Sequence, residues 1–261
     1  MPTAAHPRMP TLFIPHGAGP CFFMDWHPPD AWDRTAAFLR AIPDSLPAPP
    51  TAIVLVTAHW LAPQPSLGSA TQPGLLFDYH GFPPHTYALT YPAPGAPALA
   101  ERAATLLAAA GFMPRLDGER GYDHGCFIPL KVAFPAADVP VLQLSLLASL
   151  DAAEHLRLGR ALAPLRDEGV LIIGSGMSYH HMRGYGDPRS TPVAAEFDRW
   201  LTKRWPCRRP SARPAWPTGR APAARPGACA IRRGPRNTCC HCPWPPAPRA
   251  TAPAAACSPT G

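Results

Sequence analysis

The chain has 261 residues, of which 46% are hydrophobic and 16% are charged, so it is long and apolar enough to bury the core of one α/β domain or two small ones. Its formal charge of +7 is unevenly distributed, because 11 of the 24 Lys and Arg residues and none of the 17 Asp and Glu residues lie from Lys203 onward. The first 202 residues are therefore mildly acidic, which argues against a nucleic-acid-binding domain.

Cysteine usage and hydropathy narrow the class of protein further. No apolar run is long enough to span a bilayer, and no secretory signal pattern is present. Residues 1–202, the body of the chain, contain only Cys21 and Cys126, which cannot form a disulfide framework. The other six of the eight cysteines lie in the tail, from Lys203 onward. We therefore expect a cytoplasmic protein that binds no membrane and no nucleic acid.

The first predicted elements are two strands and a helix. An apolar run over 11–15 predicts a strand that stops at Pro15, before the Gly-rich turn "HGAGP". The β-branched run "AIVLVTA" over 52–58 is continuous enough for a strand that is buried on both faces. Helical spacing and a final glycine predict a helix over 97–111.

The second half of the body continues the alternation. The run "VPVLQLSL" predicts a strand over 139–146. A helix is expected over 149–169, capped by Ser149 or Asp151 and stopped by a glycine. A strand over 170–176 then runs into a Gly-rich turn, and a helix with proline in its first turn follows over 191–201.

Alternating strands and helices predict an α/β fold, with a central, mostly parallel or mixed sheet flanked by helices on both faces. We assign residues 1–202 to a single catalytic domain. Residues 203–261 have no hydrophobic periodicity and are rich in Pro, Ala and Arg, and we expect them to be a disordered tail.

Histidines follow the predicted strands at three separate places. His16 follows the first strand, His59 the second, and His180 comes shortly after "VLIIGSG". Carboxyl ends of parallel strands share one edge of a sheet, so three imidazoles delivered there can meet at one metal ion. His124 lies between Gly121 and Gly125, where the backbone can approach a ligand closely. Taken singly, a histidine after a strand is more often a packing or capping residue.

Other histidines receive more ordinary interpretations. We interpret His6, His27 and His155 as exposed surface residues. His80 lies in a loop rich in proline and aromatic residues, where it could line a pocket or simply pack the loop. His181 adjoins His180, and adjacent residues seldom bind the same ion, so we interpret it as a pocket wall.

Six motifs occur together and in order within about residues 10–202: "PHGAGP" (15–20), "VTAHW" (56–60), "TYPAPGAPALA" (90–100), "GYDHGCFIPLKVAFP" (121–135), "VPVLQLSL" (139–146) and "GSGMSYHHMRGY" (174–185). The set resembles the DODA-type class III extradiol ring-cleavage dioxygenases, relatives of the 4,5-DOPA dioxygenases and of the catalytic subunit of protocatechuate 4,5-dioxygenase. The resemblance implies an oxidoreductase that acts in the catabolism of aromatic compounds, as a monomer or a homodimer.

What the resemblance implies for individual residues is specific. His16 and His59 match the family's paired metal ligands, and His180 matches a histidine that serves as a ligand or as an acid–base residue. His124 matches a histidine expected to contact substrate or dioxygen and to move protons. We expect Trp60, together with His80 and His181, to line the substrate slot.

The implied reaction is the extradiol opening of a catechol by dioxygen at a mononuclear non-haem metal. Histidine ligands with open positions suit Fe(II), and the same site accepts Zn(II), which would be redox-silent. Three alternatives remain: a related binding protein without redox activity, a metal-dependent hydrolase, and an inactive product of a shifted reading frame.

The shifted-frame hypothesis comes from the tail. The family ends in a motif of the type His-Pro-x-x-x-Glu-His-(Leu/Phe)-Leu-Pro-Leu, which this chain lacks. Suppose that common codons encode residues 230–243, and that each new codon takes the third base of one codon and the first two bases of the next. The new translation then recovers that motif. We therefore infer that the reading frame is lost near Thr202–Lys203. The cluster at 239–242, Cys-Cys-His-Cys, is then a by-product of leucine codons. A zinc site is the weaker interpretation, because Cys239 and its neighbour Cys240 cannot readily close one tetrahedron.

Overall fold

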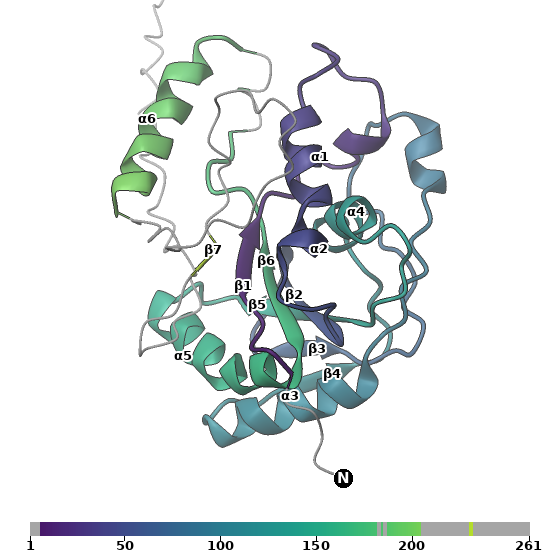
Figure 1. Ribbon diagram of the computed structural model, residues 1–261, viewed down its shortest axis with the longest axis vertical. Coiled ribbons are helices and arrows are strands. Elements are labelled where there is room, and N and C mark those ends of the chain that lie inside the picture. The colour runs from purple at the N-terminus through teal and green to yellow at the C-terminus, as the bar shows by residue number, and fades with distance from the viewer. Residues whose placement is uncertain (1–5, 182–183, 185–186, 205–229, 232–261) are drawn as a thin grey trace, which may run out of the picture.

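The computed structural model describes residues 6–181, 184, 187–204 and 230–231 (Figure 1). Within these residues the strands form one seven-stranded sheet of order β4-β3-β5-β2-β6-β1-β7. The strands are β1 (Thr11–Ile14), β2 (Ala52–Ala62), β3 (Ser66–Gly68), β4 (Arg115–Asp117), β5 (Val141–Leu147), β6 (Val170–Ser175) and β7 (Ala230–Ile231).

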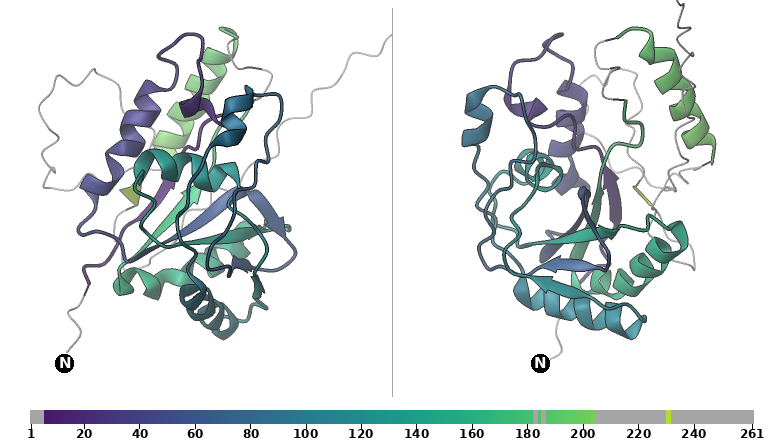
Figure 2. Two further views of the ribbon diagram at one scale, coloured as in Figure 1. Left: turned by 90° about the vertical axis from the view of Figure 1, so that its right-hand side faces the viewer. Right: turned by 180° about the vertical axis from the view of Figure 1, so that it is seen from behind.

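The helices of the described chain connect and cover this sheet. The α-helices are α1 (Asp33–Arg40), α2 (Ile42–Ser45), α3 (Pro97–Ala109), α4 (His124–Ala133), α5 (Ala152–Leu162) and α6 (Ser190–Arg204). Short 3-10 turns lie at Cys21–Phe23, Pro84–Ala88 and Ala163–Glu168. The predicted α/β fold, with a mostly parallel sheet flanked by helices on both faces, is confirmed (Figures 1 and 2).

The centre of the sheet is parallel. β2 pairs in parallel with both β5 and β6, and β6 pairs in parallel with β1. The antiparallel pairs lie toward the edges, between β3 and β5 and between β1 and β7. The carboxyl ends of β1, β2 and β6 therefore lie side by side at one edge of the sheet, which is where polar side chains that follow these strands must gather.

Two hydrophobic clusters hold the layers together. Alternate residues of β2 point to opposite faces, so Ile53 and Leu55 join one cluster while Val54 and Val56 join the other. The first cluster packs residues of α1 and α4 against the sheet, and the second packs residues of α3 and α5. Burial on both faces explains why β2 is apolar without alternation in the sequence.

Helix α4 was not among the predicted elements, and its burial explains the omission. Nine of its ten residues are buried, so it has no polar face and no amphipathic period. Its N-cap is Asp123, whose side chain accepts a hydrogen bond from the backbone N–H of Cys126. This cap determines where the helix begins and therefore where His124 lies.

The prediction that His155 is exposed is wrong. The residue is 2% exposed, and its Nε2 accepts a hydrogen bond from the backbone N–H of Leu147 at 3.0 Å. Its Nδ1 lies 2.7 Å from the carbonyl oxygen of Asp151, the N-cap of α5. The imidazole thus joins the end of β5 to the first turn of α5, a structural role that the sequence spacing did not reveal.

Most of the tail lies outside the described residues. Helix α6 extends two residues past the predicted domain boundary, to Arg204, and Ala230–Ile231 forms β7 against β1. The Cys-Cys-His-Cys cluster lies outside the described residues, and the described residues do not test the reading frame, so both stay predictions. Among the described residues, no helix is long and apolar enough to cross a membrane.

Candidate metal centre

Three imidazoles meet at the carboxyl edge of the central strands. His16, His59 and His124 each offer a ligand atom, and these atoms lie within 4.8 Å of one another. The residues come from the loop after β1, from β2 and from the first turn of α4. We refer to these three residues as the histidine cluster.

His16 is held by the end of β6. It is 2% exposed, and its Nδ1 lies 3.1 Å from Oγ of Ser175. The Ser175 hydroxyl donates its own proton to the carbonyl oxygen of Gly125, so its oxygen is left to accept from Nδ1–H of His16. This arrangement leaves Nε2 of His16 with a lone pair that faces the cluster.

His59 lies where the pairing of β2 with β5 is irregular. The register shifts between Val56 and Leu61, and such irregularities re-aim side chains. The backbone N–H of His59 donates to Oγ1 of Thr57 at 3.1 Å, and Nε2 of His59 lies 3.1 Å from Nε2 of His16. The imidazole is partly accessible, with 29% of its side chain exposed.

His124 is oriented by a carboxylate from a distant loop. Its Nδ1 lies 2.7 Å from Oδ1 of Asp78, and its backbone N–H donates to the same oxygen at 2.9 Å. A carboxylate accepts only, so Nδ1 carries the proton and Nε2 carries the lone pair. The ring centre of His124 lies 4.0 Å from that of His59 and 5.3 Å from that of His16.

A buried carboxylate beneath the cluster connects these elements. Asp123 has no exposed side-chain surface, and it accepts from Thr57 at 2.9 Å and from Nε2 of Gln143 at 2.6 Å. The guanidinium of Arg120 donates to it at 3.1 Å and lies 4.6 Å from the centre of the Trp60 ring. The network joins β2, β5 and the start of α4, so the positions of His59 and His124 depend on each other.

The donor set fits a metal ion. Zinc lies about 2.0–2.1 Å from a histidine nitrogen, so two imidazole nitrogens on one tetrahedral ion are about 3.3 Å apart. The Nε2 atoms of His16 and His59 are 3.1 Å apart, which is close to this value. Both nitrogens come from imidazoles, which suit zinc and iron alike.

Burial keeps the imidazoles of His16 and His59 neutral. Burial, followed by repulsion from the neighbouring histidines, lowers the pKa of His16 well below its usual value. Burial and the charge of His124 likewise lower the pKa of His59 to about 4. A metal binds the neutral form of imidazole, so His16 and His59 can accept an ion at pH 7 without the loss of protons.

The other residues predicted from the sequence are not members of the histidine cluster. His180 is exposed and is not one of the three grouped residues, although its charge contributes to the low pKa of both His16 and His59. His80 and His181 are also exposed. Trp60 is 7% exposed, and the guanidinium of Arg120 lies over its ring.

Sequence reasoning did not identify Asp78, Ser175 or the carboxylate of Asp123 as part of this site. Ser175 stands inside the motif "GSGMSYHHMRGY" and Asp123 inside "DHG", so the motifs contained a signal for both. Asp78 lies 46 residues before His124 in a loop without regular structure. Its role depends entirely on how that loop folds.

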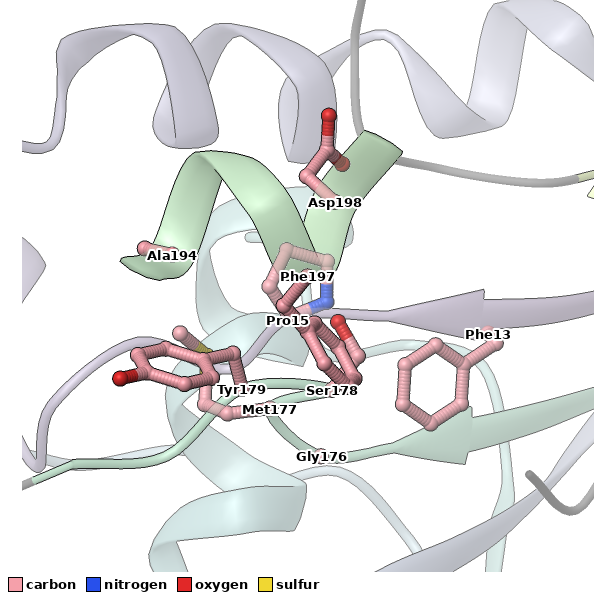
Figure 3. Close-up of a pocket in the computed structure, with 9 residues that line it drawn as sticks. All are labelled: Phe13, Pro15, Gly176, Met177, Ser178, Tyr179, Ala194, Phe197 and Asp198. Atoms are coloured by element: carbon pink, nitrogen blue, oxygen red, sulfur yellow. The ribbon is translucent and has the colours of Figure 1, made fainter. Parts of the chain in front are cut away.

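A cavity of about 260 Å³ lies beside the same edge of the sheet (Figure 3). It is bounded by the ends of β1 and β6 and by α6, and it is lined by Phe13, Pro15, Gly176, Met177, Ser178, Tyr179, Ala194, Phe197 and Asp198. Phe13 alternates with Leu12 and Ile14, which pack on the face that carries α4. The cavity therefore opens on the α6 side of the sheet, away from α4.

Comparison with known proteins gives a consistent result. The family model for the catalytic LigB subunit of aromatic ring-opening dioxygenase matches residues 10–211. The chain is 43% identical over 200 residues to a 4,5-DOPA dioxygenase extradiol of Beta vulgaris, with 73% of this chain and 70% of the relative covered. It is 38% identical over 198 residues to the protein of the same name in Escherichia coli K12, with 74% and 69% covered.

A solved structure is also similar. The crystal structure of the uncharacterized protein JW3007 from Escherichia coli K12 superposes with a TM-score of 0.56 at 35% identity, covering 76% of this chain and 72% of that chain. The family match over residues 10–211 includes all three residues of the histidine cluster.

Proposed function

We propose that this chain, which belongs to the family of the catalytic LigB subunit of aromatic ring-opening dioxygenases, opens the ring of a catechol-type substrate at a bond outside the diol. In that reaction one ring carbon–carbon bond next to the diol breaks, and both atoms of dioxygen enter the muconic semialdehyde product. The observation that carries the proposal is the histidine cluster at the carboxyl edge of β1 and β2.

His16 and His59 are the residues we propose to hold the metal, because their Nε2 atoms are 3.1 Å apart. Non-haem Fe(II) in this position would pass electron density from a bound catecholate to dioxygen, whereas Zn(II) would be redox-silent. The neutral state of both imidazoles at pH 7 supports metal binding.

Two roles remain to be assigned, that of a third metal ligand and that of a group that moves protons, and we assign them to His180 and His124. We propose His180 as the third nitrogen and His124 as the group that moves a proton. His124 suits proton transfer because Asp78 already holds its Nδ1–H at 2.7 Å, and such a carboxylate stabilises the imidazolium that forms when Nε2 accepts a proton. We also propose that the enzyme acts in the cytoplasm, where its buried free thiols Cys21 and Cys126 would stay reduced.

Anaerobic loading with Fe(II), followed by catechol and dioxygen, tests the activity. A yellow semialdehyde absorbance is expected, and His16→Ala should abolish it. The assay is run on the chain as it stands and on a version in which the tail from Lys203 onward is read in the restored frame. No colour from the restored chain would overturn the proposed reaction. Colour from that version alone would identify this chain as an inactive copy, and sequencing the DNA at the Lys203 codon would confirm the cause.

Calorimetric titration with Zn(II) tests the division of roles. His180→Gln should weaken binding by about tenfold or more, while His124→Gln should retain the ion and lose turnover. The opposite pattern would exchange the two assignments. Exposed His27 provides the control, because His27→Gln should change neither quantity.

A further inference from the structure

One carboxylate stands behind two of the three imidazoles. Oδ1 of Asp78 accepts from Nδ1 of His124 at 2.7 Å, and Oδ2 of the same residue lies 3.7 Å from Nδ1 of His59. The second distance is too long for a direct hydrogen bond but short enough for a strong electrostatic preference. Asp78 is not itself in the group of ligand atoms, so it acts on the site through these two rings.

Asp78 is held in place independently of the cluster. Leu75 forms a parallel bridge with Tyr122, and the backbone N–H of Leu76 donates to the Tyr122 carbonyl at 2.8 Å. On the other side, Tyr79 is 5% exposed and donates its hydroxyl to the carbonyl of Thr86 at 2.7 Å. A carboxylate anchored on both sides can impose an orientation on its partners.

Asp78 also occupies a favourable electrostatic position. The backbone N–H of His124 opens helix α4, and it donates to Oδ1 of Asp78 at 2.9 Å. A negative charge at the first turn of a helix is stabilised by the unpaired N–H groups there. The side chain is 21% exposed, so most of its surface is turned inward toward these donors.

The carboxylate of Asp78 favours one tautomer of each neighbouring imidazole. Without a cation, Nε2 of His59 can satisfy its 3.1 Å contact by donating a proton to Nε2 of His16, whose own proton is on Nδ1. That form places the bare Nδ1 of His59 opposite the negative Asp78, which is unfavourable. With the proton on Nδ1, the ring faces Asp78 with its N–H and presents a lone pair to the cluster.

We propose that Asp78 is a positioning residue that selects the Nδ1–H tautomer of both His59 and His124, so that Nε2 of His59 faces one point of the cluster and Nε2 of His124 is left as a proton acceptor beside it. The inference rests on the proposed function in taking that point as the position of the metal ion. Carboxylates that orient metal-binding histidines in this way contribute about 10- to 100-fold to metal affinity.

The test compares Asp78→Asn and Asp78→Ala with Asp138→Asn. Asp138 is an exposed acidic residue beyond the far end of α4, so it is a control for the loss of one negative charge. Zn(II) affinity measured by calorimetry should fall by about tenfold or more in both Asp78 variants and stay unchanged in the control. Circular dichroism establishes that each variant is folded.

Nitrogen-15 NMR of the histidine rings supplies a second measurement that needs neither turnover nor metal. In the metal-free wild type, His124 should be the Nδ1–H tautomer, and in Asp78→Ala it should become a mixture. In the Zn(II)-loaded wild type, His59 should also carry its proton on Nδ1. An unchanged His124 tautomer in a folded Asp78→Ala protein, or unchanged Zn(II) affinity in Asp78→Asn, would overturn the inference. Failure of the wild type to bind Zn(II) would instead overturn the proposed metal centre, while the His124 tautomer still tests Asp78.

Discussion

At the scale of single residues, the site depends on side chains packed so closely that a glycine is required among them. Gly125 follows His124 in the first turn of α4, and its missing side chain leaves room for two neighbours. A Cβ added there would lie 2.5 Å from Oγ1 of Thr57 and 2.9 Å from Cδ2 of His59. The close approach of α4 to β2 therefore sets the position of the His59 ring.

Gly125→Ala should displace His59 and weaken the centre. Overpacking of this kind costs about 1–3 kcal/mol of the free energy of unfolding, and the shifted ring should also lower Zn(II) affinity. Gly74→Ala is the matched control, since a Cβ there would meet nothing within 4 Å. Urea unfolding and calorimetric titration measure the two effects, and equal Zn(II) affinity in both variants would contradict the proposed role of the contact.

At the scale of elements, strand β2 combines the core and the site. Its first half supplies side chains to both hydrophobic clusters, and its second half carries His59. The same strand pairs in parallel with β5 and β6, which places it at the centre of the sheet. Such a strand is buried on both faces, so the stability of the sheet and the position of the proposed metal ligand His59 are linked.

Two leucines in β2 allow the stability contribution of a buried position to be compared with that of an exposed one. Leu55 has no exposed surface, so Leu55→Ala should reduce the free energy of unfolding by about 2–5 kcal/mol through lost burial and a residual cavity. Leu61, in the same strand, is 52% exposed, and Leu61→Ala should cost less than about 1 kcal/mol. Chemical denaturation of both variants checks the difference, and similar losses would argue against the position of β2 in the sheet.

At the scale of the whole molecule, burying neutral imidazoles makes the stability of the metal-free protein depend on pH. The pKa of His59 falls to about 4 in the folded chain, and burial lowers that of His16 as well. In the unfolded chain both imidazoles have a pKa of about 6.5. Below that pH the unfolded state binds more protons than the folded state, so stability falls as the pH falls.

The metal-free protein should therefore lose stability between pH 6.5 and pH 5, on the order of 1 kcal/mol per pH unit. The midpoint of urea unfolding, measured at several pH values, tests this. The lowest pH is kept above the range in which most carboxyl groups titrate. His59→Gln should show a smaller slope because one titrating group has been removed. A slope that is identical in the two proteins would show that His59 does not titrate as described.

The sequence by itself determined the sheet and the edge at which chemistry gathers. Continuous apolar runs form central strands because both of their faces are covered, and the histidines that follow such strands share an edge because parallel strands end together. Ordered motifs around these residues identified the family, which the comparisons confirm. The sequence placed His16 and His59 together at this edge, because each follows directly from the position of its own strand.

Only the tertiary structure decided which other side chains join them. Helix α4 had no amphipathic signal because nearly all of it is buried, and its packing against β2 brings His124 beside His59 while His180 stays exposed. Asp78 reaches His124 across 46 residues through a loop with no periodic pattern. Such contacts come from the folding of irregular backbone and from the matching of layers, and neither leaves a local pattern in the chain.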